Sequence, residues 1–216
     1  RAWATISHLN AVVNSPALRE AYNAVLPVVT QFWSELSQDE RLFARYKALR
    51  ASPAYPELSA AQHRSLENEL RDFRLGGAEL PDDKKARFQE LQEKLSTLMS
   101  KFNDNVLDAT NAFSHLVEHE NELAGLPDDA IAAAREAAAK EGKAGWKFTL
   151  HAPSYMPVMQ YAAFRPLREL MYWAYVTRVS DLGARPEWNN SVVLSQILAL
   201  RAEVAALLGY RNYAEV

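Results

Sequence analysis

Hydrophobic side chains recur at helical spacing along most of the chain. The longest such stretch runs from Pro81 to about Asp108, and its apolar positions follow at steps of 3, 4, 3 and 4 residues, at Phe88, Leu91, Leu95, Leu98 and Phe102. Residues at these steps share one face of an α-helix. Because a free coiled-coil dimer needs more heptads, the pattern predicts one long helix that packs against other helices of the same domain.

Polar residues suited to capping a helix mark several helix starts. Ser15 stands before a proline at a first helical position, and Ser59 stands three residues before Gln62, the spacing of a reciprocal capping box. The same spacing occurs in Ser37-Gln38-Asp39-Glu40, where it predicts a cap by Ser37. Two further starts combine a proline with a pair of acids, at Leu80-Pro81-Asp82-Asp83 and Leu126-Pro127-Asp128-Asp129. Each start supplies acceptors or negative charge to the backbone donors of a first helical turn.

Glycine positions mark helix ends. The helix that starts after Ser59 is expected to end near Leu75, where Gly76-Gly77 supplies a residue that adopts left-handed backbone at low cost. Helical spacing returns from Leu167 to Val179 and from Val192 to Leu208, and Gly209 follows as a stop. The coarse total is eight or nine helices.

Two short apolar and aromatic runs bounded by turn residues predict strands. They lie at Phe113 to Val117 and at Trp146 to Leu150, and we expect them to pair as a small two-stranded ribbon. The predicted fold class is therefore mainly α, with a multi-helix domain and one β ribbon. No low-complexity linker divides the chain, so residues 1–216 are expected to form a single domain.

Composition narrows the class of protein. Hydrophobic residues make up 49% and charged residues 24% of the 216 positions, which is typical of soluble globular proteins. The net charge of −3, with both signs interspersed, disfavours a nucleic-acid partner and an anionic membrane surface. No apolar run approaches the ~18 residues of a membrane span. The chain contains no cysteine, which fits a cytoplasmic location. Its start at Arg1 and its close near a new helix start suggest that both ends are truncations.

One sequence, HLVEH, has the order of an inverted zinc-peptidase motif. Its His115, Glu118 and His119 would share a helix face, and Glu187 or Glu203 could add a third ligand. No helix start precedes Phe113, however, and on a strand two imidazoles four residues apart are separated by roughly 13 Å. We therefore predict no metal ligands here. The overlapping His119-Glu120 does not open an H-E-x-x-H motif either, because residue 123 is leucine.

The remaining candidates for chemistry are also weak. No nucleophile elbow or phosphate-binding glycine loop occurs among only seven glycines. Carboxylates such as Glu67, Glu69 and Asp72 fall among basic residues at helical spacing, which is typical of a solvated face. An aromatic group could pack in the core or line a groove for peptides, with core packing favoured, and comprises Tyr155, Tyr161, Phe164, Tyr172, Trp173 and Tyr175. We predict no catalytic, cofactor-binding or metal-binding residue in this chain.

Several stretches, distributed in the family's order along nearly the whole chain, resemble the thimet oligopeptidase, neurolysin and oligopeptidase A family, most closely its oligopeptidase A branch. They are HLNAVVNSPALREAYNAVLP (8–27), LENELRDFRLGGAELP (66–81), LQEKLSTLMSKFNDNVLDAT (91–110), ELAGLPDDAI (122–131), WKFTLHAPSYMPVMQYA (146–162) and ILALRAEVAALLGYRNYAEV (197–216).

The resemblance implies a function that the residues alone do not indicate. Members are helical zinc peptidases whose two halves enclose a channel that admits short unstructured peptides, and this chain is similar to the first half. The family's zinc is held by an H-E-x-x-H helix and a downstream glutamate in the other half, so no zinc is expected in this chain. The implied role is a channel wall and size filter, inactive alone, with short peptides and the missing catalytic half as partners.

A second interpretation stays open. The chain could be a stand-alone helical module that binds a protein or peptide through its aromatic stretch. The two interpretations differ in what the gene encodes beyond Val216.

Overall fold

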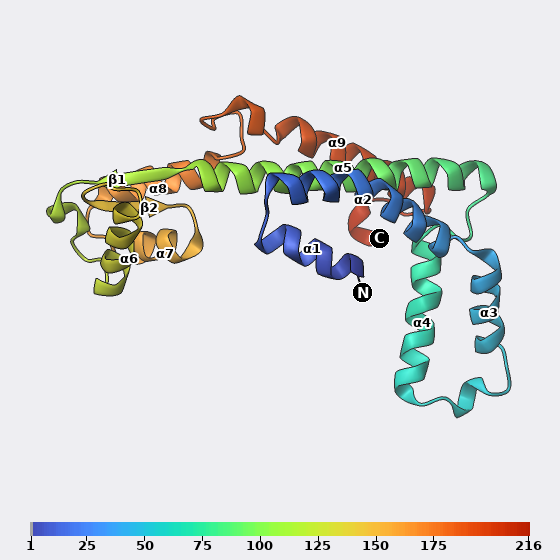
Figure 1. Ribbon diagram of the computed structural model, residues 1–216. Helices are drawn as coiled ribbons and strands as arrows, with labels where there is room; N and C mark the ends of the chain where they lie inside the picture. Colours follow the sequence, from blue (N-terminus) through green and yellow to red (C-terminus); the bar gives the residue numbers. More distant parts are fainter. Residues whose placement is uncertain (1) are drawn as a thin grey trace. The chain divides into compact units, whose positions relative to one another are not determined.

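The computed structural model describes residues 2–216. These residues form nine α-helices and one two-stranded antiparallel sheet, so the mainly α class with a small ribbon is confirmed (Figure 1). The chain divides into two compact units, one made of the chain up to Ser100 with Ser195–Val216, the other of Lys101–Leu194. Whether residues 1–216 constitute a single domain stays a prediction.

The first unit is built from helices. It contains α1 (Ala2–Val12), α2 (Pro16–Ser37), α3 (Glu40–Arg50), α4 (Ala60–Leu75), the first part of α5 (Asp82–Ala112) and most of α9 (Ser191–Leu207), with 3₁₀ turns at Tyr55–Glu57 and Tyr213–Glu215. The seam of α5 confirms the helical pattern, because Phe88, Leu91 and Leu95 are all buried. The helix extends four residues beyond the expected end near Asp108.

Helix caps explain where the first unit's helices begin. Ser15 caps α2 by accepting a hydrogen bond from the Leu18 backbone N–H, as predicted. The predicted cap by Ser37 is wrong: Ser37 is the last residue of α2, and Asp39 caps α3 by accepting from the backbone N–H groups of Arg41 and Leu42. The carboxylate satisfies two free donors at once, and the hydrogen bond from Leu42 is the main cause that lowers the pKa of Asp39.

The capping box of α4 forms as predicted and yields a stability prediction. The Ser59 hydroxyl accepts from the Gln62 backbone at 3.3 Å, and the Gln62 side chain accepts from the Ser59 backbone at 2.8 Å. We expect Ser59→Ala to lower the free energy of unfolding by about 1 kcal/mol, measured by urea denaturation. Ser65→Ala, at an exposed position inside the same helix, is the matched control and should change little. Equal effects from the two substitutions would contradict a capping role.

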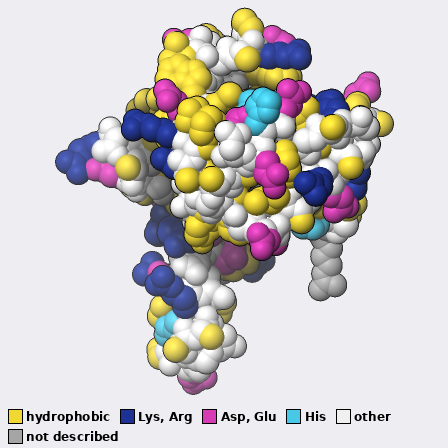
Figure 2. Space-filling view, turned by 90° about the vertical axis from the view of Figure 1, so that its left-hand side faces the viewer, with side chains coloured by type: hydrophobic (Ala, Val, Ile, Leu, Met, Phe, Trp, Pro, Cys, Tyr) yellow, Lys and Arg dark blue, Asp and Glu magenta, His cyan; other side chains and the backbone are white. Residues whose placement is uncertain are grey.

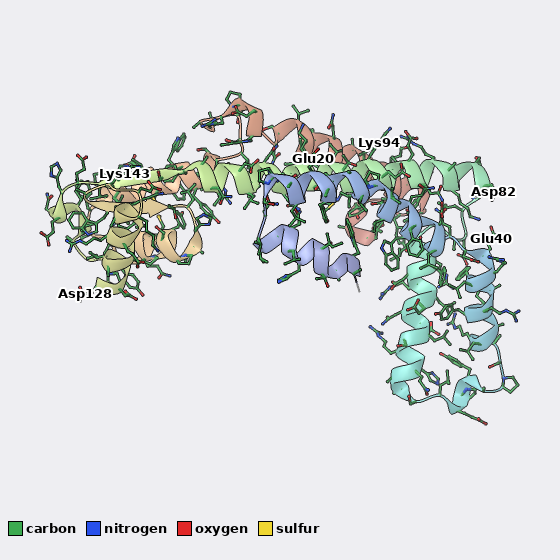
Figure 3. The ribbon with its side chains drawn as sticks, in the orientation of Figure 1. Glu20, Glu40, Asp82, Lys94, Asp128 and Lys143 are labelled. Atoms are coloured by element: carbon green, nitrogen blue, oxygen red, sulfur yellow. The ribbon has the colours of Figure 1, made fainter. Side chains whose placement is uncertain are left out.

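Helices α3 and α4 lie side by side (Figure 1). Aromatic rings pack between them. Phe43 of α3 stacks on Phe73 of α4 at a centroid distance of 5.4 Å, and both lie in a buried cluster with Leu66, Leu70 and Ala78. After α4, Gly77 adopts φ +87°, which confirms the predicted left-handed stop. Asp82 then opens α5, and near it Lys85 of α5 forms an ion pair with Glu40 of α3 (Figure 3).

The second unit combines helices with the ribbon. It holds the end of α5, β1 (Ser114–Val117), α6 (Asp128–Ala139), β2 (Trp146–Thr149), α7 (Ala152–Tyr161), α8 (Arg165–Thr177) and the start of α9, with 3₁₀ turns at Glu120–Leu123 and Pro186–Trp188. Both strands lie where the sequence predicts them, paired with Ser114 opposite Thr149 and Val117 opposite Trp146. Asp128 lies at the N-terminal end of α6, as predicted (Figure 3).

The core of the second unit lies under the ribbon. Alternation along β2 turns Trp146 and Phe148 inward, where they meet residues of α6, α7 and α8. The buried cluster includes Val117, Leu123, Leu126, Ala134, Leu150, Tyr155, Val158, Ala162, Leu167 and Met171.

One helical segment corrects the expectation about apolar runs. Pro186–Leu207 is long and apolar enough to cross a membrane by length and composition, with a mean hydropathy of 1.3. A single such helix is weak evidence for a membrane span, and 28% of its apolar window is buried inside the described structure. Within the same segment Val193, Ile197, Val204 and Ala205 are buried, and Glu203 forms an ion pair with Arg87.

Candidate functional site

The HLVEH motif lies on a strand and the turn that follows it. His115 is in β1, opposite Phe148, and His119 precedes the 3₁₀ turn at Glu120–Leu123 in extended backbone. The strand interpretation is confirmed for His115, and His119, two residues beyond β1, is not on a helix with it. Among residues 2–216 no three His, Asp or Glu side chains gather as a metal site would require. The residues present therefore do not fit zinc, and the expectation that this chain binds none stays a prediction.

Half of the aromatic group belongs to the core. Tyr155 is 9% exposed and stacks on Tyr175 at a centroid distance of 4.4 Å, while Phe164 packs partly buried against the same cluster. Burial is the main cause that raises the pKa of Tyr155, and the neighbouring Tyr175 adds to it. These three rings pack in the core, which is the interpretation that the sequence analysis favoured.

The other half is exposed, mostly on α8. Tyr172 and Trp173 are 52% and 56% exposed, and Val176, one helical turn further on, is 50% exposed. The opposite side of α8 carries the buried Leu167 and Met171. Tyr161, at the end of α7, is also exposed. Helix α8 thus presents apolar side chains both to the core and to solvent.

A cavity of about 430 Å³ lies beside α8 within the second unit. Its walls come from the end of α5, β1, α8 and the loop after α8, and its main apolar side chains are Phe113, Leu150, Leu170, Trp173, Leu182 and Trp188. Its polar residues are His115, Thr177, Arg178 and Arg185. The volume is within the range of small-ligand sites. The cavity joins the exposed ring of Trp173 to two cationic side chains.

A shallow groove of about 660 Å³ lies in the first unit. Helices α2, α5 and α9 form it, through Pro27, Glu93, Thr97, Leu98, Gln196 and Leu200. It is mostly apolar, and the charged side chains among its described walls are Glu93 and Lys94. Its geometry suits contact with another apolar segment better than catalysis.

Charged side chains largely pair with one another. Arg87 of α5 donates two hydrogen bonds to the Glu203 carboxylate of α9, at 2.6 and 2.8 Å, which raises the pKa of Arg87 and lowers that of Glu203. Glu141 pairs with Lys143 at 2.8 Å and with Lys147, and these contacts lower its pKa to about 2. On the face shown in Figure 2, acidic and basic side chains lie interspersed among apolar ones. Such pairs stabilise carboxylates as anions, which does not prepare an acid for proton transfer.

Comparison with known proteins shows which proteins this chain is similar to. The sequence profile of the N-terminal domain of neurolysin and thimet oligopeptidase matches residues 1–85. Oligopeptidase A of Haemophilus influenzae is 46% identical over 217 aligned residues, which cover 100% of this chain and 32% of that protein. The chain is thus similar to oligopeptidase A along its whole length, and to the N-terminal domain of neurolysin and thimet oligopeptidase over residues 1–85. The resemblance seen in the six stretches is confirmed.

Other relatives align over the same extent. A probable cytosolic oligopeptidase A of Arabidopsis thaliana is 41% identical, covering 99% of this chain and 31% of that protein. A dipeptidyl carboxypeptidase of Salmonella typhimurium is 29% identical, covering 97% of this chain and 30% of that protein. The chain therefore spans about a third of the length of the curated relatives it matches.

Sequence reasoning missed the cavity beside α8. None of its residues belongs to a motif, and its walls come from segments as far apart as Ala109 and Trp188. The one sequence signal for this cavity was a pair of arginines, Arg178 and Arg185, close to aromatic and small residues. That pattern is too common to indicate a binding site.

Proposed function

We propose that this chain is the N-terminal part of a zinc-dependent metalloendopeptidase that hydrolyses short, unstructured peptides in the cytoplasm. The observation that carries the proposal is the 46% identity with Oligopeptidase A across the whole chain. The relatives named oligopeptidase A are about three times as long as this chain, which leaves room for a catalytic part elsewhere in the same protein.

In this proposal the chain shapes access and performs no chemistry. Zinc supplies a Lewis acid and an activated water in peptidases of this kind, and it is held by residues outside this chain. The helices described here form one wall of the peptide channel and part of the size filter. Support comes from the pairing of Arg87 with Glu203 and of Glu141 with its lysines, which makes these groups structural.

We also propose that the remaining part of the same protein packs against this chain. Exposed apolar side chains along α2 offer it a surface, since Val25, Val28, Phe32 and Trp33 are between 46% and 65% exposed. Burying such a set in an interface is favourable at roughly 25 cal/mol per Å² of apolar area.

Hydrolysis of a quenched-fluorescent peptide of about nine residues tests the proposal. We expect the 216-residue chain to release no fluorescence and the full-length product of the same gene to cleave the peptide. A chelator should abolish that cleavage and added zinc should restore it. Cleavage by the 216-residue chain alone, abolished by the chelator, would refute the assignment of zinc to another part of the protein. A full-length product without peptidase activity would refute the proposal that the protein is a peptidase.

A stand-alone interaction module is the second candidate, favoured by the exposed Tyr172, Trp173 and Val176 on α8. It predicts that the gene ends near Val216 and encodes no peptidase. It also predicts that Trp173→Ser weakens the binding of a protein partner. A gene that continues with an H-E-x-x-H sequence removes this candidate.

A further inference from the structure

The cavity beside α8 has an apolar interior and a cationic rim. Trp173 and Leu170 line it from α8, Phe113 lines it from the residue before β1, and Leu182 and Trp188 line it from the following loop. No Asp or Glu is among its lining residues. A ligand that fits this surface carries an apolar group and a negative charge.

Arg178, which lines the cavity, has a donor without a partner. Its side chain lies over the ring of Tyr175, with Cζ 4.0 Å from the ring centroid, and its Nη1 donates to the Tyr175 carbonyl. Its Nε is buried and has no acceptor. A buried donor without a partner costs free energy, and an arginine donor is best satisfied by a carboxylate. The C-terminal end of α8 stabilises the cation but supplies nothing to Nε.

Arg185 faces the same cavity from the loop. That loop is held by backbone hydrogen bonds from Ser180 to Thr177 at 2.9 Å and from Gly183 to Ser180 at 3.1 Å. The Arg185 guanidinium lies 5.0 Å from the centroid of the Trp188 ring, and its contact with Glu187 is long, at 3.5 Å, and solvent-exposed. Such an exposed pair is weak, so Arg185 remains able to bind an anion.

We propose that this cavity binds the C-terminal residue of a short peptide, with an apolar or aromatic side chain among Leu170, Trp173 and Trp188 and the carboxylate at Arg178 and Arg185. The inference rests on the proposed function, because it takes peptides as the ligands. It adds a binding preference that peptide hydrolysis does not require. Peptides whose C-terminal residue has a free carboxylate and an apolar side chain bind in this cavity, at residues of this chain.

Binding of small probes to the ¹⁵N-labelled 216-residue chain tests the site. We expect N-acetyl-L-phenylalanine to shift the indole N–H signals of Trp173 and Trp188 saturably, assigned with Trp→Phe variants. N-acetyl-L-phenylalaninamide, which lacks the carboxylate, should bind about tenfold more weakly, and N-acetylglycine, which lacks the ring, also about tenfold more weakly. Equal binding of acid and amide, or shifts at Trp3 and Trp33 instead, would overturn the proposal.

A further probe separates peptide ends from other carboxylates. 3-Phenylpropionate carries the ring and the carboxylate without a peptide bond. We expect it to bind more weakly than N-acetyl-L-phenylalanine. Binding of 3-phenylpropionate without binding of N-acetyl-L-phenylalanine would overturn the assignment to peptide ends.

Variants locate the binding residues. Arg178→Gln should weaken N-acetyl-L-phenylalanine binding about tenfold or more, and Arg165→Gln, an exposed arginine at the start of α8 outside the cavity, should leave it unchanged. Ala112→Trp places a large ring at an exposed position of the cavity wall and should abolish binding. If Arg178→Gln fails to fold by circular dichroism, the probe series on the unmodified chain decides alone.

The outcome is separable from that of the peptidase assay. Binding by the 216-residue chain requires no hydrolysis. Cleavage by the full-length protein with no binding here overturns only the cavity proposal. Carboxylate-dependent binding here, with an inactive full-length protein, supports the cavity as a carboxylate site and refutes the peptidase.

Discussion

Phe148→Ala is expected to lower the free energy of unfolding of the second unit by about 3–5 kcal/mol, the usual cost of deleting a buried ring. Phe148 is 1% exposed on β2 and belongs to the cluster formed with α6, α7 and α8. Its removal leaves a cavity that the ribbon cannot close, because β2 is held to β1 by the backbone ladder. Urea unfolding of the chain, followed by circular dichroism, measures the loss.

The matched control is Met156→Ala. Met156 lies in the same unit but is 45% exposed, so its truncation should cost no more than about 0.5 kcal/mol. Phe148→Leu should fall between the two, because most of the buried volume is kept. A loss below about 1 kcal/mol for Phe148→Ala would contradict the placement of this ring at the centre of the core.

Local signals in the sequence were sufficient for most of the fold. Each of these signals acts on backbone only a few residues away. They are the Ser59–Gln62 capping box, the proline and acid pairs at the starts of α5 and α6, and the left-handed Gly77. The two strands were predicted for a related reason, since alternation of inward and outward side chains along β2 is a property of the strand alone.

The cap of α3 shows where a local pattern misleads. Ser37 and Asp39 both stand near a helix start, and Ser37 has the correct spacing to Glu40. The structure uses Asp39 because α2 continues through Ser37, whose hydroxyl instead donates to the Ser34 carbonyl. Which of two competing caps prevails depends on how far the preceding helix extends.

The candidate site was beyond sequence reasoning for a different reason. Core and surface rings of the aromatic group look alike in sequence, and only the packing of α7 against α8 buries Tyr155 while leaving Trp173 exposed. The free donor of Arg178 likewise follows from tertiary contacts. The lack of a helix start before Phe113 led correctly away from a helical HLVEH motif, because His115 to Val117 lie in β1.

Gly145→Ala is expected to lower the free energy of unfolding by about 3 kcal/mol, through backbone strain and a lost strand contact. Gly145 adopts φ +107°, outside the range that residues with a Cβ readily occupy. A Cβ there would lie 2.4 Å from the Val117 carbonyl oxygen, at the end of the ribbon where Val117 faces Trp146. The backbone must shift, and because it cannot do so without separating β1 from β2, the ladder weakens as well.

Gly142→Ala isolates the steric part of this effect. Gly142 also has positive φ, at +68°, but no atom lies within 4 Å of the position its Cβ would take. It should therefore cost only the left-handed conformation, about 1 kcal/mol. Urea denaturation of both variants gives the difference, and hydrogen exchange at the Val117 and Trp146 amides reports the ribbon directly. Equal losses of unfolding free energy in the two variants, with unchanged exchange at these amides, would contradict the predicted clash between a Cβ at residue 145 and β1.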